Sequence, residues 1–142
     1  EQDILSDGLF RLRENYTLGC LLAFLDRYTD RSVTLYVDNK YYLAILKQWV
    51  KHPRIKMVHK KNDAKLLNAL DAPFIVYVDN NIVDGWTHLP HFMMVMGATD
   101  KFYNVFDPWD GKTIKLSKDK LLNGIELLRS HVRVCPFVIT AK

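Results

Sequence analysis

Residues 91–111, HFMMVMGATDKFYNVFDPWDG, contain the clearest structural signal in this chain. Residues 92–96 form an unbroken apolar run that is too short for a typical helix and stops at Gly97, so they predict a strand buried on both faces. After a polar turn, residues 102–106 are rich in aromatic and β-branched side chains, which favour a second strand. The segment therefore predicts an antiparallel hairpin.

The two ends of this hairpin carry residues with acid–base chemistry. His91 stands at the start of the first strand and Asp107 at the end of the second. Because antiparallel pairing places the start of one strand beside the end of the next, we expect the imidazole and the carboxylate to lie side by side. A histidine oriented by a carboxylate is two thirds of a nucleophile–base–orienter triad. The remaining requirement is a nucleophile elsewhere in the chain.

Cys20 is the candidate nucleophile. Residues 20–28 have the continuous apolar content of a buried helix, and Thr17 is its predicted N-cap, three residues before the cysteine. In the first turn of a helix, the exposed N–H groups and the positive end of the helix dipole favour a thiolate over a thiol. Gly19 beside it permits close backbone approach by a ligand. The sequence thus predicts an activated thiol at this helix start.

Each of the three residues also has a purely structural interpretation. A free cysteine in an apolar helix commonly packs as a small hydrophobe, and an aspartate before a proline commonly starts a turn. The combination is more specific than its parts, since Cys20, His91 and Asp107 occur in the local contexts that a triad needs. We therefore interpret them as catalytic residues for attack on a carbonyl.

The composition is that of an ordinary globular protein. With 142 residues, of which 49% are hydrophobic and 25% charged, we expect a single domain over residues 1–142 with a core of its own. No apolar run approaches the ~20 residues that cross a bilayer, so no membrane partner is expected. No signal-peptide pattern is seen and the two cysteines cannot form a disulfide framework, which favours a cytoplasmic protein.

The formal net charge of +4 leaves two interpretations of the basic residues. Their densest group lies within residues 51–65, which contain six lysines and arginines. This group predicts either a solvated surface around a short strand or a patch for an acidic partner. No recognition motif for nucleic acid accompanies it, so no nucleic-acid partner is expected.

The rest of the chain indicates an α+β fold. Strands are expected at residues 9–13, 32–37, 55–59, 73–78, 112–116 and 132–140, the last interrupted by Pro136 and containing Cys135 as a core residue. Helices are expected at residues 20–28, 40–51 and 118–131, with another after Asn62 and Asp63. Asp38, Asn39 and Ser117 are further predicted caps, residues 79–90 predict a long loop, and Asp110-Gly111 predicts a tight turn. This order predicts N-terminal helices packed on a mostly antiparallel sheet.

Three segments resemble the papain-like cysteine peptidases of the bacteriocin-processing type, which cut after double-glycine leaders. The segments are NYTLGC at residues 15–20, HFMMVMG at residues 91–97 and DPWDG at residues 107–111, and the resemblance spans roughly residues 9–140. It implies a papain-like cysteine proteinase fold and a peptide or protein substrate, cut through a thioester on Cys20. His91 would then be the base and Asp107 its orienting acid, with no cofactor.

The resemblance also suggests the oxyanion hole and the substrate cleft. The family usually has a glutamine six residues before the cysteine, where this chain has Glu14, followed by Asn15. Both residues are candidates for the oxyanion hole, together with the backbone N–H of the cysteine. Trp86, Trp109 and Gly19 are the predicted substrate-binding residues, although aromatic residues near a central hairpin also serve as packing.

Two other functions remain open from the sequence. A papain-like domain without catalysis would use the cleft to hold a peptide segment, and Glu14 favours this alternative because an ionised carboxylate repels an oxyanion. A basic surface module would bind acidic partners through residues 51–65. His88 and His91 form an H-x-x-H pair without an obvious third ligand, so no metal site is expected.

Overall fold

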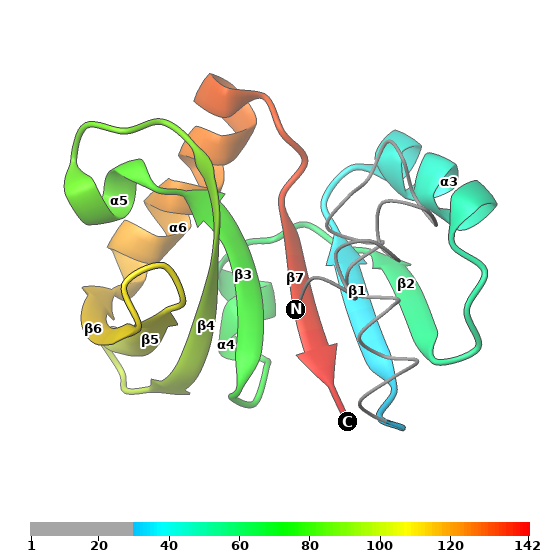
Figure 1. The fold of residues 1–142 in the computed structure, drawn as a ribbon, viewed down its shortest axis with the longest axis horizontal. Helices are drawn as coiled ribbons and strands as arrows, with labels where there is room; N and C mark the ends of the chain where they lie inside the picture. Colours follow the sequence, from blue (N-terminus) through cyan, green and yellow to red (C-terminus); the bar gives the residue numbers. More distant parts are fainter. Residues whose placement is uncertain (1–29) are drawn as a thin grey trace.

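The computed structural model describes residues 30–142, which form one seven-stranded sheet in the order β2-β1-β7-β3-β4-β5-β6 (Figure 1). The strands are β1 (Val33–Val37), β2 (Ile55–His59), β3 (Phe74–Asp79), β4 (Pro90–Ala98), β5 (Phe102–Asp107), β6 (Lys112–Ser117) and β7 (Phe137–Ala141). The helices are α3 (Lys40–Trp49), α4 (Ala64–Asn68), α5 (Asn81–Asp84) and α6 (Lys118–Leu127), continued by the π-helical η1 (Leu128–Val132).

The sheet is mostly antiparallel, as the sequence predicts. β1 and β2 are parallel and are connected by α3, whereas every other neighbouring pair in the described sheet is antiparallel. β3, β4, β5 and β6 are consecutive along the chain and adjacent in the sheet. Short turns join β4 to β5 and β5 to β6, whereas residues 80–89, which include α5, join β3 to β4. The predicted hairpin is therefore the β4–β5 pair, with one bulge between Val95 and Gly97.

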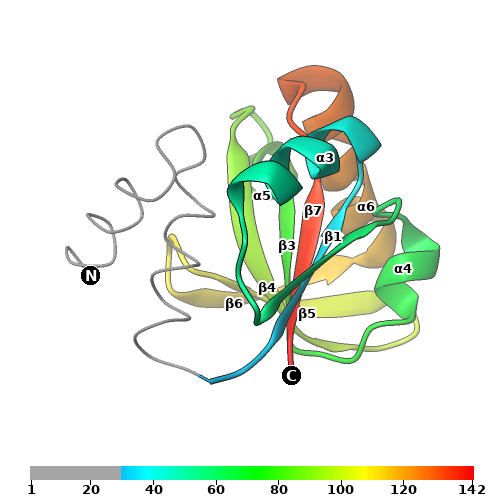
Figure 2. The same cartoon turned by 90° about the vertical axis from the view of Figure 1, so that its right-hand side faces the viewer.

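Helices cover the two faces of the sheet at different places. Figure 2 shows α4 and α6 on one side of the sheet and α3 on the other. The first side buries the larger core, formed by alternate residues of β3, β4 and β5 with α6, and including Val76, Met93, Val105, Leu121 and Ile125. The second side buries β1 and β7 against α3. This arrangement gives the α+β architecture, with the β4–β5 hairpin against the larger core.

Three of the helices begin at the predicted capping side chains. Asn39 accepts hydrogen bonds from the N–H groups of Tyr41 and Tyr42 at the start of α3. Asp63 caps α4 and Ser117 caps α6 in the same way. Each cap satisfies N–H groups that have no partner within the helix, so the predicted starts of these helices are confirmed.

Four details of the sequence prediction are wrong. β4, the strand predicted to be buried on both faces, is fully buried on one face only, and Met96 on the other face is 51% exposed. The expected loop at residues 79–90 contains α5, a helix of only four residues, which is too short to show helical periodicity in the sequence. The helix expected to continue to His131 becomes π-helical after Leu127. The last strand begins at Phe137, not at residue 132, so Cys135 precedes the strand and is half-buried beside the smaller core.

A network of hydrogen bonds around Arg129 holds η1 against the end of β1. Its guanidinium donates from Nε to Asp38 Oδ2 at 2.7 Å and from Nη2 to the carbonyl of Asn62 at 2.8 Å. The Asn62 N–H donates in turn to Asp38 Oδ1. Burial raises the pKa of Asp38, but the hydrogen bonds from Arg129 and Asn62 and the guanidinium charge outweigh it, leaving that pKa below its ordinary value. The carboxylate is therefore ionised where it holds the network together.

The close approach of α5 to α6 depends on Gly124. A Cβ atom added there would lie 2.8 Å from Cδ1 and 2.9 Å from Cγ2 of Ile82. We expect Gly124→Ala to lower the free energy of unfolding by about 1 kcal/mol, because overpacking costs about 1–3 kcal/mol and alanine returns up to about 1 kcal/mol of helix propensity. Urea denaturation measures the change, and Ile82→Val in the same chain should recover part of it. Equal losses in the single and double variants would contradict this packing contact.

Candidate active site

The structure brings His91 and Asp107 together at one end of the β4–β5 hairpin. His91 is the second residue of β4 and Asp107 is the last of β5. The distance between His91 Nε2 and Asp107 Oδ1 is 2.8 Å, and the two side chains are only 7% and 5% exposed. The predicted juxtaposition of the two ends of the hairpin is confirmed.

The turn after β5 holds the carboxylate in place. Asp107 Oδ1 accepts a second hydrogen bond, from the backbone N–H of Trp109 at 2.9 Å. The backbone N–H of Gly111 donates to the Asp107 carbonyl at 2.9 Å. Gly111 has a φ of 67°, in the left-handed region that glycine adopts without a Cβ clash. The predicted Asp110-Gly111 turn is thus confirmed, and it positions the carboxylate that is bonded to the His91 ring.

The hydrogen bond to Asp107 distinguishes the two ring nitrogens of His91. Nε2 faces the carboxylate, so Nδ1 is the nitrogen left to exchange a proton with a nucleophile. His91 lies two positions from Met93, and Asp107 lies two positions from Val105, so each pair is on the same face of the sheet. His91 and Asp107 therefore border the larger core. The two side chains therefore lie at the ends of two inner strands of the sheet and are almost fully buried.

Trp109 lies directly against this pair. Its ring centroid is 5.3 Å from that of His91, and the residue is 67% exposed. Trp109 also lines a pocket of about 390 Å³, together with Val83, Leu89 and residues of the turns on either side. Trp86, the other predicted substrate-binding tryptophan, is 79% exposed and does not line that pocket. The structure therefore places Trp109, but not Trp86, beside the base.

A second histidine–carboxylate pair lies at the same end of the sheet. His88 Nδ1 is 2.8 Å from Oδ2 of Asp79, which is completely buried at the end of β3. The His88 ring also lies against the His131 ring, with centroids 3.9 Å apart and the ring planes tilted by 34°. Sequence reasoning missed Asp79, although an aspartate ending a buried strand was a signal for it. His88 and His91 each have a carboxylate of their own. Among the described residues, no group of three or more His, Cys, Asp and Glu side chains could hold a metal ion.

Four predicted site residues lie outside the described part of the chain. They are Glu14, Asn15, Gly19 and Cys20, the proposed oxyanion-hole, substrate-binding and nucleophilic residues. The predicted strand at residues 9–13 and the predicted helix at residues 20–28 also lie outside it. The described part of the candidate site therefore consists of His91, Asp107 and the adjoining pocket.

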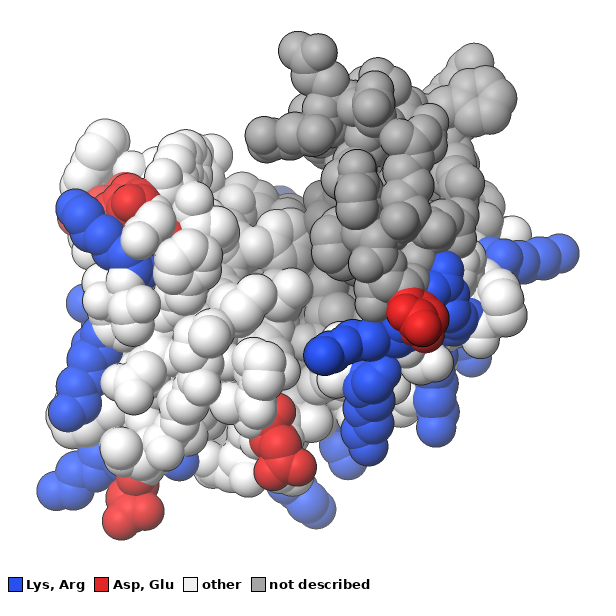
Figure 3. Space-filling view, turned by 60° about the horizontal axis from the view of Figure 1, so that its bottom comes forward, with Lys and Arg blue, Asp and Glu red and all other residues white. Residues whose placement is uncertain are grey.

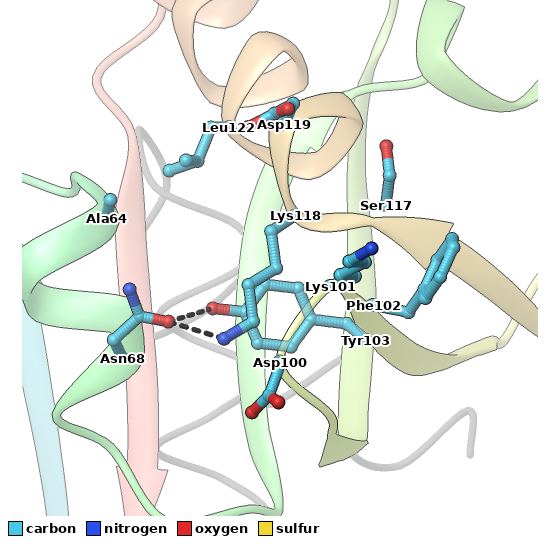
Figure 4. Close-up of a pocket in the computed structure, with 10 residues that line it drawn as sticks. All are labelled: Ala64, Asn68, Asp100, Lys101, Phe102, Tyr103, Ser117, Lys118, Asp119 and Leu122. Atoms are coloured by element: carbon cyan, nitrogen blue, oxygen red, sulfur yellow. Dashed lines mark hydrogen bonds between the residues drawn. The ribbon is translucent and has the colours of Figure 1, made fainter.

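Another pocket, of about 450 Å³, lies at the other end of the hairpin (Figure 4). Figure 4 shows the side chains of Tyr103 and Lys118 converging on Asn68, whose Oδ1 accepts hydrogen bonds from the tyrosine hydroxyl at 3.3 Å and the ammonium at 2.8 Å. Neither His91 nor Asp107 lines this pocket. This pocket contains no histidine or cysteine, so the hairpin end with His91 is the candidate active site.

Cys135, the free cysteine within residues 30–142, does not belong to the candidate active site. Cys135 lines a pocket of about 630 Å³ with Asp38 and Arg129. Burial raises the pKa of its thiol, and the backbone N–H groups of Asn39 and Asp38 only partly offset this effect. Cys135 is therefore a protonated thiol near neutral pH and a poor nucleophile.

The basic residues do not surround the candidate site. Figure 3 shows lysine and arginine side chains on the β1–β2 side of the molecule and on the β5–β6 side, with largely uncharged surface between them. The residues that line the pocket beside Trp109 include Asp84 and Asp110 and no lysine or arginine. The described lining of this pocket thus carries two carboxylates, one of them 3.9 Å from the Lys112 ammonium, although the whole chain carries a positive net charge.

Comparison with known protein families agrees with this site. A family model described as the Peptidase C39 family matches residues 37–124, which include both His91 and Asp107. The match covers more than half of the chain, and the chain belongs to this family of cysteine peptidases, whose fold is papain-like. No curated protein sequence matches the chain. No helix within residues 30–142 is both long enough and apolar enough to cross a bilayer.

Proposed function

We propose that this protein is a cysteine-dependent peptide or amide hydrolase with Cys20, His91 and Asp107 as its catalytic triad. The observation that carries the proposal is the buried hydrogen bond between His91 and Asp107, next to a pocket in a chain of the Peptidase C39 family. A base oriented through Nε2 presents Nδ1 to the nucleophile. Cys20 is the sequence's candidate for that nucleophile because it opens a predicted helix.

The proposed reaction has two acyl-transfer steps. His91 Nδ1 takes the proton of the Cys20 thiol, and the thiolate attacks the carbonyl carbon to give a tetrahedral intermediate. The Cys20 N–H and the side chain of Asn15 or Glu14 stabilise its oxyanion. His91 then gives the proton to the departing amine, leaving a thioester. A water molecule deprotonated by His91 hydrolyses the thioester, and the proton returns to the thiolate.

Asp107 acts on this sequence through the imidazole. Its buried carboxylate keeps the Nε2–H tautomer and stabilises the imidazolium that forms while the sulfur is ionised. The same arrangement would serve transfer of the acyl group to another amine, or deamidation of a side chain. Hydrolysis is the proposed outcome because water is the most abundant acceptor for a thioester.

The experiment that tests the proposal is digestion of a peptide library followed by mass spectrometry. Wild type should generate new peptide termini, whereas Cys20→Ala and His91→Ala should leave the library unchanged. A binding-only domain, which Glu14 favours, would leave the library unchanged in all three digests. Cleavage that survives Cys20→Ala would overturn the assignment of the nucleophile.

We expect iodoacetamide to label Cys20 faster than Cys135 at neutral pH. The reason is that a thiol paired with His91 is partly ionised, whereas burial raises the pKa of Cys135. Time-resolved labelling with peptide mapping measures both rates in one sample. His91→Ala should slow the labelling of Cys20 and leave that of Cys135 unchanged. Faster labelling of Cys135 in wild type would contradict the proposed nucleophile.

A further inference from the structure

The pocket beside Trp109 combines an apolar wall with carboxylates. Val83 and Leu89 line it together with the exposed indole, and Asp84 and Asp110 supply its charges. Its volume of about 390 Å³ is enough for a long side chain. An aromatic face, aliphatic surface and carboxylates together match a side chain that has an apolar stem and a cationic end.

The position of this pocket relates it to the reacting centre. Trp109 lines the pocket and lies against the ring of His91, so one indole separates the pocket from the base. The Trp109 N–H is bonded to Asp107, which also holds the imidazole. The backbone at Trp109 is therefore tied to the carboxylate that bonds His91, so a substrate side chain in the pocket belongs to a residue near the scissile bond.

We propose that this pocket is a specificity subsite that binds a lysine or arginine side chain of the substrate, an inference that rests on the proposed peptidase function. The aliphatic stem packs between Leu89, Val83 and the indole of Trp109. The cationic group lies over the indole face and against the carboxylates of Asp84 and Asp110. Acidic side chains are excluded by the same two charges.

The two carboxylates have different roles in the subsite. Asp84 Oδ1 accepts hydrogen bonds from the N–H groups of Trp86 and Thr87, and its Oδ2 accepts one from Asn80, so it is held rigidly. Asp110 is 55% exposed and forms a long ion pair with Lys112, whose ammonium lies 3.9 Å from its Oδ2. Because both side chains of this surface pair are more than half exposed, the pair is weak and a cationic ligand can compete with Lys112 for Asp110. Substitution of Asp110 changes the charge without removing the hydrogen bonds that fix Asp84.

Because the chain has a positive net charge, a preference for basic substrate peptides would indicate a specific acidic site. At a formal charge of +4, non-specific attraction favours acidic peptides. A preference for basic peptides therefore requires a local acidic site that overcomes the overall charge. The pocket beside Trp109 is such a site, close to the base.

The test compares wild type with Asp110→Lys in the digestion of a peptide library. Wild type should show lysine and arginine enriched at one position relative to the scissile bond, and Asp110→Lys should reduce that enrichment at least about fivefold. Asp100→Lys makes the same charge change in the turn at the other end of the hairpin and should keep the wild-type preference. Asp110→Asn provides a milder second variant if the lysine variant is unstable.

The failure of the subsite and the failure of the peptidase function give different results. Cleavage without a basic preference, or a preference that Asp110→Lys and Asp110→Asn both keep, would overturn the subsite. If wild type cuts nothing, retention of library peptides on immobilised Cys20→Ser protein decides the question. Selective retention of basic peptides that Asp110→Lys abolishes would support the subsite while the peptidase proposal falls. Retention without that selectivity would overturn both.

Discussion

Replacing His91 with alanine is expected to lower kcat/KM for peptide cleavage by about 1,000-fold or more. General acid–base catalysis by a positioned side chain contributes about 10²–10⁴-fold, and His91 would act in both transfer steps. The change removes the imidazole but leaves Asp107 with its hydrogen bond from the Trp109 N–H. The loss should therefore appear mainly in kcat, measured with a peptide taken from the library digest.

The control for this result is another histidine of the sheet. His59 ends β2, far along the sheet from the β4–β5 hairpin, so His59→Ala should retain wild-type kcat/KM. Circular dichroism should show the same folded spectrum for both variants. More than a tenth of wild-type activity in His91→Ala would remove the histidine from the mechanism.

Asp107 provides a graded form of the same experiment. Asparagine keeps an oxygen that can accept from the His91 ring and from the Trp109 N–H, but it removes the charge that stabilises the imidazolium. Asp107→Asn should therefore lose less activity than His91→Ala, about 100-fold. A kcat of Asp107→Asn equal to that of wild type would show that the buried carboxylate has no effect on the base.

Replacing Arg129 with methionine is expected to lower the free energy of unfolding by about 3 kcal/mol. Removing one partner of a largely buried ion pair leaves the other charge without compensation, which typically costs about 3–5 kcal/mol. Here the stranded groups are the Asp38 carboxylate and the Asn62 carbonyl, both bonded to the guanidinium. Urea denaturation followed by circular dichroism measures the loss.

The Arg129 variant should also change the dependence of stability on pH. Because folding lowers the pKa of Asp38, its contribution is complete above the unfolded carboxyl pKa of about 3.9 and is lost as the pH falls through the lower folded value. Without Arg129 this lowering is reduced, so the stability of the variant should fall less steeply in that acid range. Parallel pH profiles for wild type and variant would contradict the assigned ion pair.

Two further variants isolate the buried part of this network. Glu126 also bonds Arg129, but its side chain is 61% exposed, so Glu126→Gln should cost no more than about 1 kcal/mol. Combining Arg129→Met with Asp38→Asn removes both buried charges and should recover part of the stability lost in the single variant. A double variant as unstable as the sum of the two single variants would indicate that their charges do not interact.

Local patterns in the sequence were sufficient to predict the hairpin and the helix starts. The apolar run before Gly97 and the aromatic strand after it predicted β4 and β5, because strand pairing across a short turn depends on adjacent residues. The contact between His91 and Asp107 was predictable for the same reason, because it follows from the pairing of these two strands. The caps at Asn39, Asp63 and Ser117 were predictable because a cap bonds the backbone within three residues of itself.

Such local patterns could not predict contacts between segments that are distant in the sequence. Asp38 and Arg129 are separated by 91 positions and meet only after β1 and η1 have packed, so no local spacing marks the pair. The pairing of His88 with Asp79 depends on α5, which is too short to show a period in the sequence. The pocket beside His91 is likewise formed by two segments that are separate in the sequence, within residues 80–89 and 109–110.

The sequence by itself determined the antiparallel hairpin, its histidine–aspartate pair and the α+β class, since periodicity, turn residues and capping act over a few neighbouring positions. Only the tertiary structure decided that β1 lies between β2 and β7, that Trp109 stands between the base and a pocket, and that carboxylates line that pocket. These features depend on how the elements pack their apolar faces together, and many packings satisfy the same local pattern.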